Sequence, residues 1–393
     1  MPLIKKSVIL TFVLTGAAIG ASLFWRADEK EFKKTEFSGE EEEAAYVLSE
    51  MKICYGRGGR DGCYRTVSEK ILNRLSLERV LDIFQKNETR PEIFSRCHEA
   101  THFLARKEYK RVQDLKEIFS VCTAVCHGGC YHGAMESYFA QKNLPIQNPG
   151  DPAIEKEIQN ACGAPSKNQK PNVYTECLHG IGHAVMFITD GDIFKSLALC
   201  DKLGLISEKE TCYGGVFMEN SSSSTNNDHP GKFIRKDDPL YPCSALDERY
   251  LQQCFAYQSS HFAIISKHNW AKTAELCRTV PEKYRRGCFE IIGTNQVGFT
   301  QDMSIMKKNC GTIREPEFKD ACIRGVVISL TGRYHDDPER IIPFCPIVDP
   351  ENKKSCYEQI DSSLLGWFSD ETEKNQYCAL LKEPSYSNLC QIK

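Results

Sequence analysis

The spacing of the cysteines constrains this chain more than any other feature. Of its 20 cysteines, ten recur at intervals of 34, 33, 47, 35, 42, 34, 34, 34 and 34 residues. These ten are Cys63, Cys97, Cys130, Cys177, Cys212, Cys254, Cys288, Cys322, Cys356 and Cys390. A period of this length is typical of helical hairpins, which must stack on their neighbours to bury their apolar faces. The two long intervals contain insertions within 143–172 and 220–232, which we interpret as surface loops.

A second cysteine precedes nearly every one of these ten by a short interval. The expected pairs are Cys54–Cys63, Cys122–Cys130, Cys162–Cys177, Cys200–Cys212, Cys243–Cys254, Cys277–Cys288, Cys310–Cys322, Cys345–Cys356 and Cys378–Cys390. Cys97 and Cys126 remain and can pair with each other, although the spacing also allows Cys97 to pair with Cys122. Apolar periodicity before several first cysteines, as in 269–277, predicts a second helix in each unit.

The repeat unit is therefore helix A, a turn, helix B ending in a cysteine, a polar loop, and the cysteine that opens the next helix A. Each disulfide would join the end of one hairpin to the start of the next. We predict an all-α fold, a curved solenoid of hairpins about 34 residues long. This arrangement resembles the disulfide-stapled Sel1-like branch of the tetratricopeptide family, in which an aromatic residue often follows the opening cysteine, as in Cys288-Phe289 and Cys212-Tyr213. The resemblance implies a stacked helical shape and a tendency to bind peptides or proteins.

The N-terminus predicts a position at a membrane. Residues 7–25 (SVILTFVLTGAAIGASLFW) are uncharged, long enough to cross a bilayer, and preceded by Lys5 and Lys6. The positive-inside rule then places everything after Trp25 outside the cytoplasm. Small residues near the end of the segment also fit a cleaved signal peptide, but its length and Trp25 favour an uncleaved anchor.

Three regions follow from this pattern. Residues 1–26 are the signal-anchor or signal peptide, 27–45 are a charged, solvated stalk, and 46–393 are the disulfide-rich repeat domain. So many cysteines fit an oxidising compartment better than a reducing cytosol. We expect a single-pass membrane protein with an extracytoplasmic C-terminal domain, or a secreted protein if the segment is cleaved. A formal net charge of -3 shows no basic excess, so we expect no nucleic-acid partner.

Potential metal ligands are concentrated in successive predicted helices A. His98 and His102 are four residues apart, as are the pairs formed by His132 with Glu136 and by His179 with His183, so each pair shares one helical face. The last two pairs stand at the same offset from their cysteines and should be neighbours in a stack. The candidate ligands are His98, His102, His132, Glu136, His179, His183, Glu219 and His261.

The ligand types limit the metal and the chemistry. A mixture of imidazoles and carboxylates suits zinc, iron or manganese, and Met135, Met186 and Met218 in the same helices keep copper open. The segment 98–102 (HEATH) is similar to the zinc-binding helix of zincin metalloproteases, which makes Glu99 a weak candidate for a catalytic base. A structural role for each single histidine remains the alternative.

Two other features have structural interpretations. We expect Cys126 and Cys130, in the segment 126–130 (CHGGC), to form disulfides rather than to bind metal as thiolates. Glycines recur three residues after several cysteines, where they allow neighbouring helices to approach closely. These glycines are Gly133, Gly180, Gly215 and Gly325.

Two functions remain. One is an extracytoplasmic metal-binding repeat protein, with its site on the second to sixth repeats, used for metal storage, delivery or metal-assisted hydrolysis. The other is a non-catalytic envelope scaffold that binds a peptide or protein on a concave face. Later repeats favour a local site, because Glu290, Arg324 and Glu358 stand where earlier repeats have histidine. The sequence does not decide between an enzyme and a carrier.

Overall fold

The computed structural model describes residues 37–380 apart from 59–60, 145–147, 149–150, 164–170, 223–230, 236, 336, 365–366 and 369–370. In this part of the chain the fold is all-helical, and residues 36–393 form one compact unit. The apolar segment 7–25 lies outside the described residues. None of the described helices has both the length and the apolar character needed to cross a membrane. Helix α1 (Glu40–Gly56) begins inside the segment 27–45 that the sequence predicts as a stalk.

The predicted alternation of two helices is present. The helices that correspond to helix A are α2 (Asp61–Leu72), α5 (Cys97–Val112), α7 (Gly129–Gln141), α9 (Pro171–Ile188), α11 (Ile206–Ser222), α12 (Glu248–Ile265), α14 (Glu282–Val297), α16 (Pro316–Tyr334) and α18 (Pro350–Leu364). The shorter helices between them are α3 (Leu77–Lys86), α4 (Pro91–Phe94), α6 (Leu115–Val121), α8 (Pro152–Ala161), α10 (Ile193–Cys200), α13 (Trp270–Thr279), α15 (Met303–Cys310), α17 (Phe344–Ile347) and α19 (Glu371–Ala379), with the 3-10 turns η2 (Cys243–Ala245) and η3 (Pro338–Arg340).

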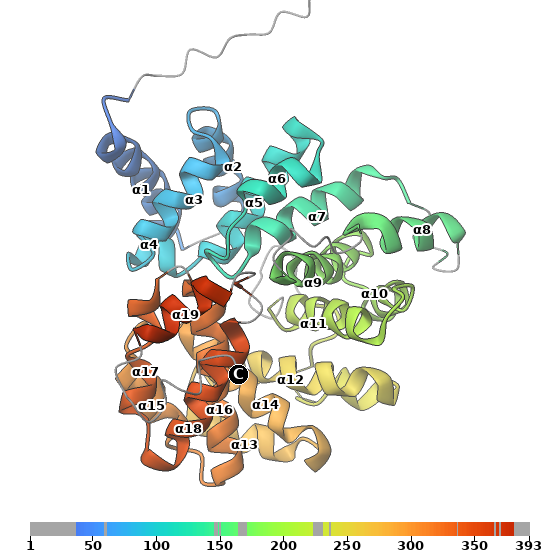
Figure 1. Ribbon diagram of the computed structural model, residues 1–393. Helices are drawn as coiled ribbons and strands as arrows, with labels where there is room; N and C mark the ends of the chain where they lie inside the picture. Colours follow the sequence, from blue (N-terminus) through green and yellow to red (C-terminus); the bar gives the residue numbers. More distant parts are fainter. Residues whose placement is uncertain are drawn as a thin grey trace, which may run out of the picture. The chain divides into compact units, whose positions relative to one another are not determined.

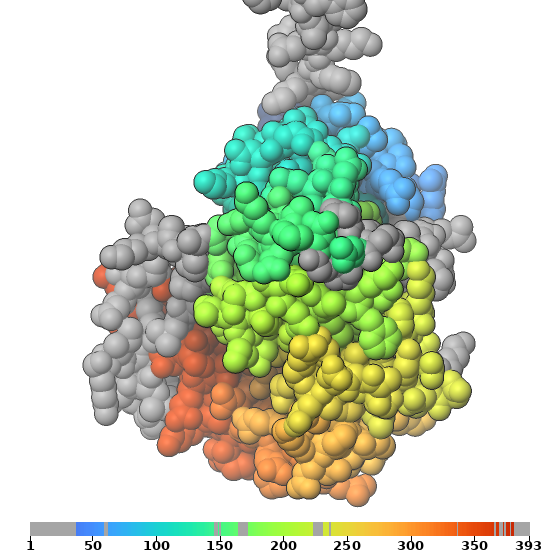
Figure 2. Space-filling model, turned by 90° about the vertical axis from the view of Figure 1, so that its right-hand side faces the viewer, coloured from blue at the N-terminus to red at the C-terminus, as the bar shows by residue number. Residues whose placement is uncertain are grey.

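Each helix of the first group packs on the next one along the chain, from α2 on α5 to α16 on α18 (Figure 1). Figure 2 shows the same order on one face, where the green segments are followed by yellow and then orange ones. Neighbouring repeats are therefore the main packing partners, as a repeat array requires.

Polar residues at the start of helix B fix where each hairpin turns. The Asp114 carboxylate accepts hydrogen bonds from two backbone N–H groups at the start of α6, and Asp302 does the same for α15. Ser76, Asp192 and Asn269 likewise cap α3, α10 and α13. Such caps stabilise a helix start by about 1 kcal/mol, because they satisfy donors that the helix leaves without partners.

Nine disulfides join described cysteines. Eight of them link consecutive hairpins, and Cys97–Cys126 joins the start of α5 to the loop that follows α6. Cys97 pairs with Cys126 and Cys122 with Cys130, which decides between the two connectivities that the spacing allowed. The predicted pair Cys378–Cys390 lies outside the residues whose side chains are described. The cysteines do not always open helix A: Cys177 and Cys212 lie inside α9 and α11, because those helices begin at Pro171 and Ile206.

Two helix contacts near the histidines are backbone against backbone. A Cβ atom on Gly133 of α7 would lie 2.2 Å from the His102 carbonyl oxygen of α5. A Cβ on Gly215 of α11 would lie 2.1 Å from the His179 carbonyl oxygen of α9. Only glycine fits at these two crossings, as the sequence predicts. The close approach brings the side chains that flank each glycine into contact with the next helix.

The first hairpins also contact late repeats directly. Glu88, which follows α3, is buried and forms ion pairs with Arg333 of α16 and Arg340 of η3. The Nη1 atom of Arg333 lies 3.0 Å from the Nε2 atom of His127. These contacts join residues more than 200 positions apart in the sequence. The packing thus includes contacts beyond nearest-neighbour repeats, which the prediction of a simple stack did not contain.

Candidate metal centre

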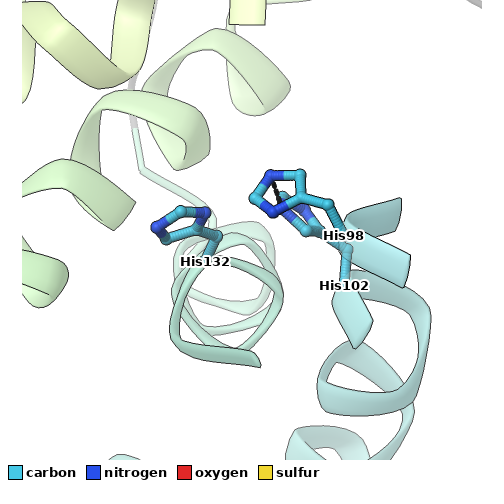
Figure 3. Close-up of side chains that lie close together, drawn as sticks. All are labelled: His98, His102 and His132. Carbon is cyan, nitrogen blue, oxygen red and sulfur yellow. Dashed lines mark hydrogen bonds between the residues drawn. The ribbon is translucent and has the colours of Figure 1, made fainter. Parts of the chain in front are cut away.

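Five histidines from three successive helices form one cluster, which we call the histidine cluster. His98 and His102 come from α5, His132 from α7, and His179 and His183 from α9. Figure 3 shows His98 and His102 side by side on one helix, with His132 beside them on the next. The ring centroids of His98 and His102 are 4.6 Å apart, and those of His132 and His183 are 4.5 Å apart. The equal offsets of His132 and His179 from their cysteines do place those two rings together, with centroids 5.1 Å apart.

On α5, each ring has one nitrogen occupied by a hydrogen-bond acceptor. His98 donates from Nδ1 to the Cys126 carbonyl oxygen at 2.9 Å. His102 donates from Nδ1 to a Glu136 carboxylate oxygen at 3.0 Å. Because a neutral imidazole carries one proton, each bond leaves Nε2 with an unprotonated lone pair. The two Nε2 atoms lie 3.1 Å apart, so their lone pairs face each other when both rings are neutral.

The rings on α7 and α9 follow the same rule. His132 donates from Nε2 to Glu176 at 3.3 Å, and His183 donates from Nδ1 to Glu219 at 2.8 Å. The remaining nitrogens, Nδ1 of His132 and Nε2 of His183, are buried and have no hydrogen-bond partner among the described residues. Leaving a buried acceptor without a partner costs about 1–3 kcal/mol. An ion that accepts these lone pairs would remove that cost.

The geometry fits a small transition ion. Two nitrogens bound to one tetrahedral ion at 2.0–2.1 Å are separated by ~3.3 Å, close to the 3.1 Å between the Nε2 atoms of His98 and His102. Donor atoms within 4.8 Å of one another also occur in three overlapping groups. These groups are His98 with His102 and His132; His132 with His179 and His183; and His102 with Glu136 and His183.

The electrostatics keep three of the rings neutral. Burial, followed by the neighbouring rings of His102 and His183, holds the pKa of His98 well below its usual range. Burial and the adjacent ring of His183 do the same to the pKa of His132. For His179, burial is again the main cause, and it lowers the pKa to about 3. Neutral imidazole is the form that binds metal, so these rings are ready to act as ligands at neutral pH.

Three carboxylates surround the rings. Burial would raise the pKa of Glu136, but Arg106 and His102 outweigh it and hold that pKa below its usual range. Burial would also raise the pKa of Glu219, but its hydrogen bond and its electrostatic interaction with His183 together hold that pKa below its usual range. Glu176 has no such cation beside it, and burial raises its pKa to about 7. Each of these carboxylates binds the engaged nitrogen of one ring, and together they can compensate the charge of a bound cation.

The remaining predicted residues occupy different places. His179 lies 3.4 Å from the Met218 sulfur through its Nε2 atom. His261 is buried with both ring nitrogens lacking partners, but it belongs to none of the three donor groups. Glu99 is ion-paired with Arg96 at 3.6 Å, and no contact with a histidine is among its described interactions. Cys126 contributes its carbonyl oxygen rather than a thiolate, because its sulfur is bonded to Cys97.

Sequence reasoning missed two residues of this site. Glu176 precedes His179 by three positions, a helical spacing that would have drawn attention to it. Arg106 follows His102 by four positions and pairs with Glu136 across the helix contact. The role of the Cys126 carbonyl carries no sequence signal, since every residue has one.

No family model, curated protein or solved structure matches this chain.

Proposed function

We propose that this protein binds one transition-metal ion through Nε2 of His98, Nε2 of His102, Nδ1 of His132 and Nε2 of His183. The observation that carries the proposal is that in each ring the opposite nitrogen is already engaged by an acceptor. Metal-binding histidines in proteins have this arrangement, in which a carboxylate or carbonyl fixes the tautomer and the orientation of the ring. Donor atoms of His98, His102 and His132 lie within 4.8 Å of one another, and the His183 ring stacks on that of His132, so a bound ion would draw these four rings into a tetrahedral ligand set.

The ligand set favours storage or delivery of the ion over hydrolysis. Imidazole suits zinc, copper, iron and nickel, and zinc takes four ligands in closed sites. A hydrolytic zinc site keeps one position open for water, whereas four histidines fill the tetrahedron. The position of Glu99 agrees with this, since its partner is Arg96 rather than a ring of the histidine cluster. Zinc and copper both suit this set, and we use zinc as the ion for its test.

We further propose that the protein works outside the cytoplasm, anchored by the apolar segment 7–25, with its Sel1-like hairpins arranged as a solenoid. The disulfides support the oxidising compartment, because such bonds do not persist in a reducing cytosol. The stacking of the long helices in chain order supports the repeat architecture.

Metal content tests the proposal. The purified, oxidised protein is stripped with a chelator and titrated with zinc by calorimetry, with elemental analysis of the loaded form. We expect about one ion per chain, and at least a hundredfold weaker binding in His132→Ala and His183→Ala. His268→Ala is the matched control, because that ring packs on Phe299 and takes no part in the cluster. If the stripped protein takes up no ion and matches the two variants in thermal stability, the histidines are packing residues and the scaffold interpretation replaces this one.

A further inference from the structure

Beside the four proposed ligands, the fifth histidine of the cluster faces a thioether instead of an acceptor. Nε2 of His179 lies 3.4 Å from Sδ of Met218 on α11. The thioether sulfur is only a weak hydrogen-bond acceptor, so an N–H group at Nε2 would gain little from this contact.

The same contact is a good pair of metal ligands. An ion bound to nitrogen at about 2.0 Å and to sulfur at about 2.3 Å with tetrahedral angles separates those two atoms by ~3.5 Å. The observed 3.4 Å matches that separation without movement of the helices. Thioether sulfur is a soft ligand that selects monovalent copper, while hard ions gain nothing from it.

The repeat register supports the same role for Met218. It stands six residues after Cys212, as Glu136 does after Cys130 and His183 after Cys177. In the two earlier repeats this position belongs to the metal centre, and in the third it carries a methionine. The next repeat has Ser260 there, which instead hydrogen-bonds to Asn295. The series of possible ligands thus ends at Met218.

Exposure places this pair on the accessible side of the cluster. His132 and His183 are each only 1% exposed, whereas His179 and Met218 are both partly exposed. His179 also shares a group of donor atoms within 4.8 Å with His132 and His183. An ion held at His179 would need only to exchange one ligand for another to reach the inner rings.

We propose that His179 and Met218 form a second, softer binding position for monovalent copper at the entrance of the four-histidine site, from which copper passes inward by ligand exchange. This rests on the proposed function, because the entrance has a purpose only if the inner rings bind metal. It assigns to the protein a cargo, copper in its reduced state, that the four imidazoles alone do not specify. No electron transfer is involved, since copper enters and moves as Cu(I).

Two variants test this position. Cu(I) is supplied anaerobically as its acetonitrile complex, without thiol reductants, so that the disulfides stay intact. We expect X-ray absorption of the wild-type protein at substoichiometric copper to show a sulfur neighbour at ~2.3 Å. Met218→Leu should lose that sulfur signal and bind Cu(I) at least tenfold more weakly, with zinc affinity within threefold of wild type. Met306→Leu, a buried methionine of α15, is the matched control and should change neither value.

The outcomes separate the two proposals. If wild type binds zinc as expected but shows no sulfur neighbour for Cu(I), and Met218→Leu binds Cu(I) normally, the entrance position is refuted and the four-histidine site stands. If Met218→Leu weakens zinc and copper equally, Met218 acts through packing and the inference is likewise overturned. If wild type binds neither ion, the proposed function itself fails.

Discussion

His183 donates its Nδ1 proton to Glu219 at 2.8 Å, and its other nitrogen is buried without a partner among the described residues. The carboxylate therefore sets the tautomer of the ring and aims Nε2 at the rest of the cluster. Neighbouring helices have the same kind of histidine–carboxylate hydrogen bond, between His102 and Glu136 and between His132 and Glu176. The acids thus act on the metal through the rings, and their removal should be measurable apart from the loss of a ligand.

Replacing Glu219 with glutamine should weaken zinc binding by about 10- to 100-fold, because the amide orients His183 without raising its basicity. The fold should persist, since Glu219 is only partly buried. Calorimetric titration of the stripped variant measures the effect, with exposed Glu282→Gln as control. Unchanged affinity in Glu219→Gln would show that Nε2 of His183 is not a ligand.

Gly133→Ala should both destabilise the protein and weaken its metal site. The added Cβ would meet the His102 carbonyl oxygen at 2.2 Å, so α5 and α7 must separate and carry His102 away from His132. Gly332→Ala provides the matched control, because a Cβ there meets nothing within 4 Å and alanine favours the helix by up to about 1 kcal/mol. Thermal unfolding and zinc titration of both variants check the prediction. Equal behaviour of the two would contradict the close helix contact.

The metal-free protein should become less stable as the pH is lowered, and part of this loss should come from His127. Burial, assisted by Arg333, lowers the pKa of this ring to about 3 from the ordinary 6.5. Below pH 6.5 the His127 ring is protonated in the unfolded chain but stays neutral in the folded protein. The free energy of unfolding therefore decreases by up to about 1.4 kcal/mol per pH unit until the pH nears 3. His127→Gln cannot take up this proton. Urea unfolding between pH 7 and pH 4 should therefore show a smaller loss in the variant, and parallel curves would refute this assignment.

Glu88→Gln should cost the fold about 3–5 kcal/mol, because it leaves the buried Arg333 guanidinium without its compensating charge. Urea unfolding at pH 7 measures the change. Glu248→Gln is the control, since its ion pair with Lys283 is at the surface and its loss should leave the unfolding midpoint unchanged. A Glu88→Gln variant as stable as wild type would mean that early and late repeats do not rely on this contact.

The sequence predicted the helical repeat and the histidine cluster through the same signal. Cysteine spacing defined the register, and residues at equal offsets on stacked helices had to be neighbours, as His132 and His179 are, with ring centroids 5.1 Å apart. The spacing was a poorer guide to residues that are shifted relative to the repeat. His98 and His102 are shifted by one position relative to the later pairs, yet their rings join the cluster because α5 crosses α7 closely at Gly133.

The features that the sequence did not predict depend on contacts between distant residues, which leave no local pattern in the sequence. Glu88 and Arg333 are separated by 245 residues, and no periodicity links an acid in one loop to an arginine so distant. His261 shares the seven-residue offset of Glu219, but it belongs to none of the donor groups around the cluster. Equal offset predicts proximity only between adjacent repeats, and α11 separates His261 of α12 from the His179 and His183 rings of α9.

The disulfide between Cys97 and Cys126 ties the residue before His98 to the residue whose carbonyl orients that ring. A covalent bond thus aligns the ring that we propose as a ligand. In the reduced chain this alignment is missing, and its 20 thiols would compete as thiolates for the same soft ions. If the histidine cluster binds metal as proposed, oxidation would have to come before metallation, because an ion that met the nascent chain earlier would bind its cysteines and block the disulfides that build the site.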